Sequence, residues 1–232
     1  AAINAKEKLT VYGDYDADGI CATAIVVETL QALGATVDWY VPERLAEGYG
    51  LNTDAITDIA AKGTKVLITV DCGTSNVAEV EHANAQGLEV IILDHHQAPP
   101  VLPPALAIIN PFLPGQTYPW HGHSSGGVAY KLAGALMSAS DYGKKTGTAL
   151  PVGWEKWLLD LVAISTVADM MPLVDENRVF VLFGLRVLRR TRRLGLRALF
   201  RQMGIDPEEA PEQTIGFQIA PRLNAAGRLQ HA

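Results

Sequence analysis

The sequence predicts an α/β fold in which a mainly parallel sheet is flanked by helices and followed by a mostly helical C-terminal portion. Two observations lead to this prediction. Up to about residue 110, short apolar runs alternate with segments of helical periodicity, the pattern of repeated strand–helix–strand units. After a proline-rich stretch at 99–119 only helical periodicity remains.

The expected strands are short and rich in β-branched residues. The runs KVLITV and LEVIIL are almost continuously apolar, as expected for strands that are buried on both faces. We expect strands at 9–13, 36–41, 65–70, 88–93 and 105–109.

The expected helices connect these strands and then fill the C-terminal portion. The helix at 20–33 ends at Gly34 and the helix at 53–61 ends before Gly63, since glycine commonly terminates helices. Further helices are expected at 75–86, 127–139, 154–168, 176–190 and 194–203, with an acidic linker at 206–213.

We therefore expect three parts. Residues 1–142 form the α/β core, residues 143–205 form a helical part of the same domain, and residues 206–232 form a linker that leads toward a further domain.

Composition excludes several classes of protein. With 232 residues, 48% of them apolar and 19% charged, the chain is long and apolar enough to bury a core, unlike a disordered protein. No apolar run approaches the roughly 18 residues needed to cross a bilayer, so no membrane association is expected. Cys21 and Cys72 are too few for a disulfide scaffold or a four-cysteine zinc site. A cytoplasmic protein is expected.

The formal net charge of −6 hides a local excess of positive charge. This excess is either a solvated helix face with salt-bridge partners or an electropositive surface. The arginines concerned are Arg186, Arg189, Arg190, Arg192, Arg193, Arg197 and Arg201.

Acidic residues and a histidine pair follow three of the predicted strands. GDYDADG at 13–19 follows the first strand, VDCGT at 70–74 the third, and DHH at 94–96 the fourth. Functional groups gather beyond the carboxyl ends of parallel strands, so these side chains are expected at one rim. Clustered like charges are costly unless a cation compensates them, and carboxylates with some imidazole favour manganese or magnesium. The sequence therefore predicts a metal site.

The pattern D-x-D-x-D-G also begins a calcium-binding EF-hand loop. Such a loop needs a bidentate glutamate at its twelfth position, where this chain has Ile25. A strand also precedes the motif, in place of the required helix. The EF-hand interpretation is therefore rejected.

A further carboxylate, Asp169, ends the predicted helix at 154–168. Val167, Met170 and Met171 surround it with apolar side chains. A carboxylate in such surroundings needs a partner, and the metal site would supply one.

The motifs GDYDADG, VDCGT, DHH and TVAD, in this order, resemble those of the DHH phosphoesterase superfamily. Four longer stretches resemble the RecJ family of bacterial single-strand-specific exonucleases: PERLAEGYGLN, SSGGVAYKL, ADMMPLVDENR and IAPRLNAAGR. The resemblance implies a Rossmann-like core of the DHH type that cleaves phosphodiesters with two divalent cations, manganese first and magnesium as the alternative. Family members continue into further domains, so we expect this chain to be the catalytic core of a longer enzyme.

The resemblance also implies a role for each motif residue. Asp71 would bridge the two cations, and His96 would be a ligand or a contact to substrate phosphate. Asp94 would orient its neighbours as a hydrogen-bond acceptor. The implied catalytic residues are Asp71, His95 and His96, and the implied metal ligands are Asp14, Asp16, Asp18, Asp71, His95 and Asp169.

One group of candidate substrate contacts opens the helix expected from residue 127. Backbone amides at a helix N-terminus can hold a phosphate, and glycine permits close approach. The same residues also fit an ordinary helix start. They are Ser124, Ser125, Gly126 and Gly127.

Other candidate contacts come from the resemblance. Arg222, Asn224 and Arg228 lie in PRLNAAGR, which approaches the scissile phosphate in the family, and arginine matches phosphate geometry. Arg44 is either a contact to the substrate 5′-phosphate or a loop arginine paired with a neighbouring glutamate.

The implied function is metal-dependent 5′-to-3′ hydrolysis of single-stranded DNA to mononucleotides, in repair and recombination. Two alternatives stay open: a phosphoesterase for short oligonucleotides, nucleotide bisphosphates or cyclic dinucleotides, and a non-catalytic DNA-binding relative. The complete ligand set argues against the second. The expected partners are single-stranded DNA with a 5′ end and, in the cell, a single-strand-binding protein or helicase. The chain is expected to be a monomer.

Overall fold

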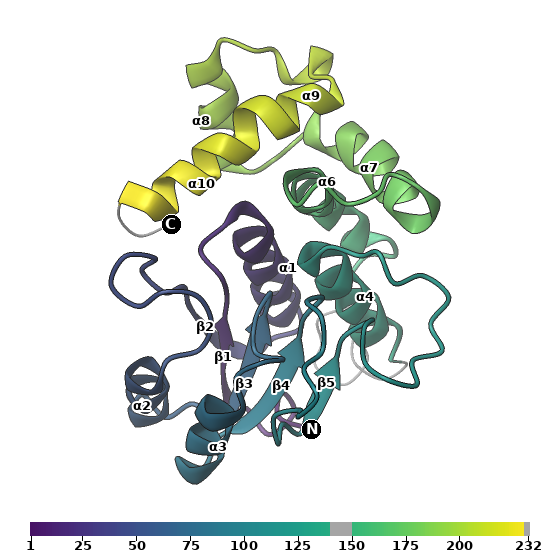
Figure 1. The fold of residues 1–232 in the computed structure, drawn as a ribbon. Coiled ribbons are helices and arrows are strands. Elements are labelled where there is room, and N and C mark those ends of the chain that lie inside the picture. The colour runs from purple at the N-terminus through teal and green to yellow at the C-terminus, as the bar shows by residue number, and fades with distance from the viewer. Residues whose placement is uncertain (140–149, 230–232) are drawn as a thin grey trace.

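The computed structural model describes residues 1–139 and 150–229, which include a five-stranded sheet (Figure 1). Every strand pairing in this sheet is parallel. The strands are β1 (Lys8–Tyr12), β2 (Thr36–Tyr40), β3 (Val66–Val70), β4 (Glu89–Leu93) and β5 (Ala107–Ile109). The predicted parallel sheet is confirmed, and the strands lie close to their expected positions.

The strand order is β2-β1-β3-β4-β5, so β1, β3 and β4 lie side by side. All side chains of the central strand β3 are buried, which explains its unbroken apolar sequence. The chain first moves from β1 to β2 and then returns to the other side of β1. Such a reversal of strand order opens a crevice at the carboxyl ends of the neighbouring strands. The acidic motifs after β1 and β3 meet there.

Helices cover both faces of the sheet (Figure 1). One apolar cluster packs under the helices of one face, and a second cluster packs under those of the other. The first face carries α1 (Ala17–Ala32) and α4 (Ser125–Ser138), on which α6 (Leu159–Ala168) packs, and the second carries α2 (Thr53–Ala61) and α3 (Val77–Ala85).

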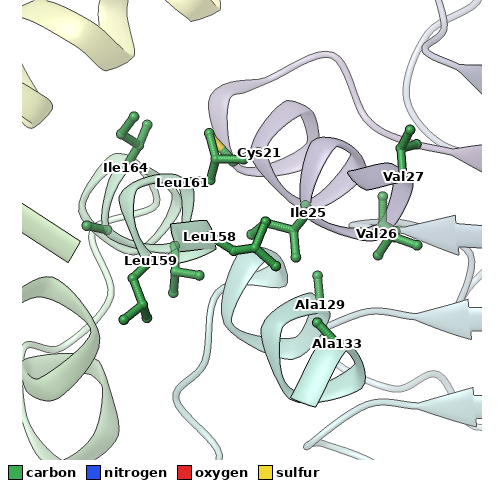
Figure 2. Packing of buried hydrophobic residues seen from close by; sticks show 14 of the residues in the cluster. Cys21, Ile25, Val26, Val27, Ala129, Ala133, Leu158, Leu159, Leu161 and Ile164 are labelled. Carbon is green, nitrogen blue, oxygen red and sulfur yellow. The ribbon is translucent and has the colours of Figure 1, made fainter. Parts of the chain in front are cut away.

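The first cluster lies where α1, α4 and α6 meet (Figure 2). Ile25 of α1 and Leu158, directly before α6, are at most 1% exposed, and α4 contributes the small Ala129 and Ala133. Alternating large and small side chains let facing helices interdigitate. Each fully buried large aliphatic side chain contributes about 1.5–3 kcal/mol. The cluster therefore fixes the three helices that also carry residues of the site.

The C-terminal portion is helical, as predicted, but residues 206–213 form short helical turns where a linker was expected. Asp206 caps one turn by accepting the Glu208 N–H, and Pro207 begins it. Across residues 1–139 and 150–229, every helix is too short or too polar to span a bilayer. The elements are η1 (Trp154–Leu158), α7 (Asp175–Leu188), α8 (Leu194–Met203), η2 (Pro207–Glu209), α9 (Glu212–Thr214), the π-helical turn η3 (Ile215–Ile219) and α10 (Ala220–Leu229).

Candidate metal centre

The loop after β1 carries Asp14, Asp16 and Asp18. Asp16 caps α1 because its Oδ1 accepts the Gly19 N–H at 2.9 Å, so the helix begins three residues earlier than its apolar pattern indicates. Asp14 is 4% exposed. A Cβ atom at Gly19 would lie 2.6 Å from that of Asp14, so only glycine permits this tight turn.

Asp71 follows β3 in an unusual backbone conformation. Its φ is +64°, a left-handed value that is uncommon outside glycine. Three contacts hold it there: its N–H donates to the Leu93 carbonyl, the Tyr49 hydroxyl donates to its carbonyl at 3.0 Å, and the Ser125 hydroxyl donates to its Oδ1 at 2.8 Å. The backbone turn and these partners direct the carboxylate toward β4.

Asp94 organises the DHH turn after β4. Its Oδ1 accepts the His95 N–H at 2.8 Å and the His96 ring Nδ1–H at 2.8 Å, and its Oδ2 accepts the Thr74 N–H at 3.0 Å. Burial alone would raise the pKa of Asp94, but the hydrogen bonds from His96 and Thr74 outweigh it and lower that pKa. Asp94 is therefore a stable anion that orients both histidines.

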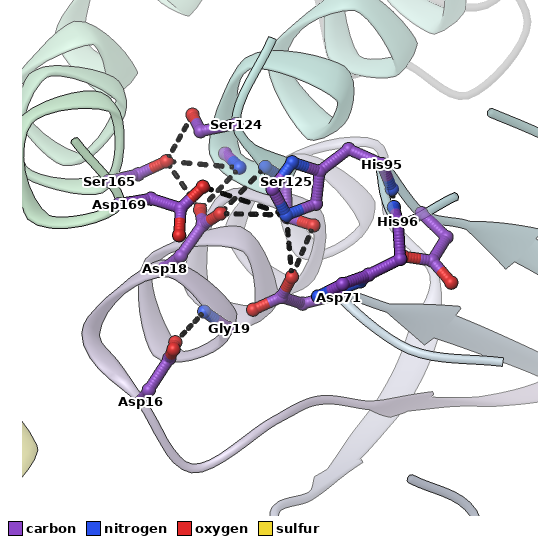
Figure 3. Close-up of polar contacts among 12 residues, drawn as sticks. Asp16, Asp18, Gly19, Asp71, His95, His96, Ser124, Ser125, Ser165 and Asp169 are labelled. Carbon is purple, nitrogen blue, oxygen red and sulfur yellow. Dashed lines mark hydrogen bonds and ion pairs between the residues drawn. The ribbon is translucent and has the colours of Figure 1, made fainter. Parts of the chain in front are cut away.

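His95 lies at the centre of the carboxylates (Figure 3). Its Nε2 is 3.1 Å from Asp71 Oδ1, 3.5 Å from Asp18 Oδ2 and 3.8 Å from Asp169 Oδ2. These residues come from the ends of β3, β4 and α6 and from the first turn of α1. The structure thus gathers at one point side chains that the sequence separates by up to 151 residues, from Asp18 to Asp169.

Asp18 is held by the N-terminus of α4. Its Oδ2 accepts the Ser125 N–H at 2.9 Å, and its Oδ1 accepts the Gly126 N–H at 2.9 Å and the Ser165 hydroxyl at 2.5 Å. A Cβ atom at Gly126 would lie 2.3 Å from the Ser165 Oγ, so glycine is needed there. Helix-terminal amides suit an anion, and here that anion is the protein's own carboxylate.

This arrangement bears on the predicted phosphate contacts at 124–127. Ser124 caps α4, since its Oγ accepts the Gly127 N–H at 3.3 Å. The residues 124–127 are buried. The amides of Ser125 and Gly126 already serve Asp18. The geometry therefore favours the alternative of a helix start, and a phosphate contact by these residues stays a prediction.

Asp169 reaches the centre from the end of α6. It follows the last helical residue, and Met170 then turns the chain away with a φ of +52°. The Met170 side chain is 89% exposed, so the apolar surroundings expected from the sequence do not form on that side. The carboxylate itself faces His95, as the metal-site prediction requires.

The carboxylates repel one another in the absence of a cation. Burial, followed by the charge of Asp16, raises the pKa of Asp14 to about 7. Burial, followed by Asp18, raises the pKa of Asp169 to about 6 and that of Asp71 well above its ordinary value. Burial without a positive partner has this effect on an acid. A cation is the partner that would reverse it.

The donors are suitably spaced for a cation. In each of three overlapping groups the ligand atoms lie within 4.8 Å of one another, and Asp71 and His95 each belong to two groups. In addition, Asp14 Oδ1 is buried and has no hydrogen-bond partner among the described residues. The groups are Asp14, Asp16 and Asp71; Asp18, His95 and Asp169; and Asp71, His95 and His96. Oxygen donors with one or two imidazoles fit manganese or magnesium.

Two of the three predicted arginine contacts, Arg44 and Arg222, contact residues other than the ligands of this centre. Arg44 is exposed, and its guanidinium lies 5.2 Å from the ring centroid of Tyr15, between Asp14 and Asp16 in sequence. Arg222 is exposed on α10 and donates to the Gln218 carbonyl at 2.9 Å. The side chain of Arg228 lies outside the described part of the structure.

Asn224 also belongs to the predicted substrate contacts. The structure places it on α10, against the first turn of α1, where its Oδ1 accepts the Ala17 N–H.

Several polar residues of the centre were missed by sequence reasoning. The hydroxyl of Tyr49 supports the Asp71 backbone carbonyl. Ser165 touches Asp18, and Asn110 donates to the His96 carbonyl at 2.9 Å. The only signal for Ser165 was its position four residues before Asp169, one helical turn away. Asn110 directly follows the strand expected at 105–109, so its place at a strand end was a signal that could have found it.

The arginine-rich segment is of mixed character. Arg193 pairs with Glu28 and with the buried Asp160, and Arg189 donates to the Ala210 carbonyl at 3.1 Å. Arg192 lies 3.8 Å from the ring centroid of Trp157. Two of the arginines thus support the fold, in keeping with the salt-bridge interpretation. Others are exposed: Arg186, Arg190, Arg192, Arg197 and Arg201.

Comparison with known proteins places this geometry in a family. The model of the DHH family, N-terminal domain, matches residues 8–166. The single-stranded-DNA-specific exonuclease RecJ of Bacillus subtilis is 48% identical over 231 residues, which cover 100% of this chain and 28% of that protein. The chain thus spans less than a third of that relative's length.

Two solved structures extend the comparison. An exonuclease RecJ bound to manganese matches with a TM-score of 0.85 and 36% identity, covering 99% of this chain and 55% of that one. RecJ of Thermus thermophilus in complex with Mg²⁺ matches with a TM-score of 0.62 and 32% identity, covering 98% of this chain and 27% of that one. With the family model spanning more than half of its residues and these neighbours sharing its fold, the chain belongs to the DHH family.

Proposed function

We propose that this chain is the catalytic core of a metal-dependent exonuclease that hydrolyses single-stranded DNA from the 5′ end to mononucleotides. The gathering of Asp71, His95 and the flanking carboxylates supports the hydrolytic chemistry. The substrate is supported by the relatives, which are named single-stranded-DNA-specific exonucleases. The 5′-to-3′ direction rests on the resemblance alone. A role in DNA repair and recombination follows from the same proposal.

We assign the metal ligands from the groups described above. Asp71 lies in one group with Asp14 and Asp16 and in another with His95, so it would bridge two cations. Asp14 and Asp16 would hold one, and Asp18, His95 and Asp169 the other. Bound manganese or magnesium supplies Lewis-acid stabilisation of charge on phosphate oxygens. The manganese- and magnesium-bound RecJ neighbours support both metals.

The protein's own groups orient this machinery. Ser125 and Tyr49 fix Asp71, and Asp94 fixes His95 and His96. The His96 side chain is 48% exposed while its Nδ1 is held by Asp94, so its other ring edge is available to a substrate phosphate. We therefore assign His96 to phosphate contact rather than to metal ligation.

Substrate contacts beyond the centre remain proposals. Arg44, stacked on Tyr15, is positioned near the loop of Asp14 and Asp16 and suits a 5′-phosphate. Arg222 and Arg228 lie on α10 and would contact the phosphate backbone.

The wider setting is proposed on the same basis. We propose a cytoplasmic monomer that works with a single-strand-binding protein or a helicase. We also propose the division into residues 1–142, 143–205 and 206–232, although the boundary after residue 142 lies outside the described residues. In the longer relatives, further domains would complete the DNA groove. We therefore expect the chain alone to cleave less processively than one with those domains.

The decisive experiment is manganese binding and hydrolysis by Asp71→Ala. We expect calorimetry to show manganese binding to the wild type, and 5′-phosphorylated single-stranded DNA to be cut to mononucleotides. Asp71→Ala should lose both, while Asp58→Ala, an exposed carboxylate on α2, should lose neither. Undiminished hydrolysis by Asp71→Ala would refute the metal assignment. Preference for a dinucleotide over a long strand would instead indicate a small-substrate phosphoesterase.

A further inference from the structure

A hydrogen bond joins the C-terminal helix α10 to the first turn of α1. The Asn224 Oδ1 on α10 accepts the backbone N–H of Ala17 at 2.7 Å, across 207 residues of sequence. Figure 1 shows α10 lying across the start of α1. The bond is part-buried, so it is shielded from competing water.

The Ala17 amide, which donates to Asn224, lies between two of the proposed metal ligands, Asp16 and Asp18. Ala17 is the first residue of α1, and amides in the first turn of a helix have no partner within the helix. The Asp16 side chain satisfies the Gly19 amide. Asn224 satisfies the Ala17 amide, which lies in the peptide that joins Asp16 to Ala17.

A second contact holds α10 independently of Asn224. Ile215 and Ile219 of η3, directly before α10, are 0% exposed and pack in the cluster that includes α6. A π-helical turn of this kind is rare and frequently occurs at functional sites. The segment η3–α10 thus touches α1, which carries Asp18, and α6, which ends at Asp169.

We propose that Asn224 is a positioning residue that acts through the Ala17 peptide on the carboxylates of Asp16 and Asp18. This proposal rests on the proposed function, because it concerns ligands of the same metal centre. It differs from the expectation that Asn224 binds substrate, since its Oδ1 is already engaged. Folding of the C-terminal segment onto α1 would then be a condition for full metal affinity.

Two substitutions separate positioning from substrate contact. Asn224→Leu keeps the approximate size and removes the acceptor, whereas Asn224→Asp keeps the acceptor. Gln218→Ala on η3 is the matched control, because the Gln218 side chain makes no hydrogen bond among the described residues and only its backbone carbonyl accepts from Arg222. Thermal melting of each variant checks that the chain remains folded.

The readouts are amide hydrogen exchange at Ala17, manganese calorimetry and hydrolysis kinetics. For Asn224→Leu we expect Ala17 to exchange at least about fivefold faster, as for loss of a capping bond. Manganese affinity should fall roughly tenfold, as for loss of a residue that orients a ligand. The kcat should fall while KM changes less than about twofold. Asn224→Asp should retain Ala17 protection, and Gln218→Ala should match the wild type.

The opposite pattern would overturn the proposal. If Asn224→Leu raised KM and left Ala17 exchange and manganese affinity unchanged, Asn224 would be a substrate contact only. If the wild type binds manganese but does not hydrolyse single-stranded DNA, the proposed function fails while exchange and calorimetry still decide the role of Asn224. If the wild type binds no manganese, both proposals are wrong.

Discussion

Asp94 and Asp71 end neighbouring strands and are buried almost equally, at 1% and 3% exposure, but their surroundings are opposite. Asp94 accepts hydrogen bonds from the amides of Thr74 and His95 and from the His96 ring, and its pKa is lowered. Asp71 accepts the Ser125 hydroxyl, and its Oδ1 lies 3.1 Å from the His95 Nε2. It also faces Asp18 and Asp16, and burial together with these charges raises its pKa.

The difference separates two kinds of buried charge. The charge of Asp94 is compensated by hydrogen-bond donors from the DHH turn and from Thr74. The carboxylates of Asp14 and Asp71 have too few donors, and an uncompensated buried charge costs stability. The fold therefore keeps these carboxylates at an energetic cost that a bound cation removes. This is the physical reason to treat the rim as a functional site.

The largest expected effect concerns Asp71→Asn. We expect manganese-dependent hydrolysis to fall by at least roughly 10³-fold, because the shared ligand of the centre is lost. The same variant should melt at a higher temperature than the metal-free wild type at pH 8, since a repelled charge is removed. Hydrolysis assays and calorimetric melting curves measure the two effects. A lower melting temperature would show that the Asp71 charge is compensated without metal.

Asp94→Asn is the matched substitution on the neighbouring strand. It places an amide group among hydrogen-bond donors, so we expect a loss of about 2–3 kcal/mol in the free energy of unfolding. Urea denaturation without metal measures this loss. The comparison between the two regions predicts opposite signs for Asp94→Asn and Asp71→Asn. A stability change of the same sign for both substitutions would contradict the comparison.

The pH dependence of stability should follow the carboxylates whose pKa is raised. Asp14 has its pKa raised from 3.8 to about 7, so the folded state binds more protons than the unfolded state between those values. The metal-free protein should therefore become less stable as pH rises through this range. Asp94, with a lowered pKa, acts oppositely: its contribution is lost only as pH falls below the ordinary range of an aspartate.

Melting curves from pH 4 to pH 8 measure this dependence. Saturating manganese should flatten or reverse the slope, because bound ligands must be deprotonated. Asp14→Asn should reduce the slope without metal. A metal-free protein that gains stability steadily from pH 4 to pH 8 would contradict the raised pKa values.

The smallest expected effect is that of Ser165→Ala. Ser165 donates to Asp18 at 2.5 Å, but the amides of Ser125 and Gly126 continue to hold that carboxylate. We expect a loss of about 1 kcal/mol in stability and a decrease of less than about tenfold in manganese affinity. Ser138→Ala, at the exposed end of α4, is the control for both measurements. A decrease in manganese affinity well beyond about tenfold would mean that the α4 amides do not hold Asp18.

The sequence predicted more of the fold than of the polar contacts. The apolar strand at 65–70 and the helix at 53–61 were placed correctly, because burial on both faces and glycine stops leave local signals. Residues 206–213 were expected to be a linker, and the structure shows short helical turns there. Their proline and acidic residues were taken for a loop signal, but Asp206 and Pro207 begin a turn.

The candidate site shows the same division. Asp14, Asp16, Asp71 and His95 were found because each lies within a few residues after a strand whose position was predictable, and the ends of parallel strands meet at one rim. The sequence alone thus determined which elements form and which carboxylates they bring to the rim.

Only the tertiary structure decided what holds those carboxylates. The Ser125 amide reaches Asp18 across 107 residues, and Asn224 reaches Ala17 across 207. Such contacts depend on how α4 and α10 pack on α1, and a local sequence pattern contains no information about packing between distant helices. For the same reason the amides expected to bind phosphate were found to bind a carboxylate: the anion nearest to a helix N-terminus is set by the assembled fold.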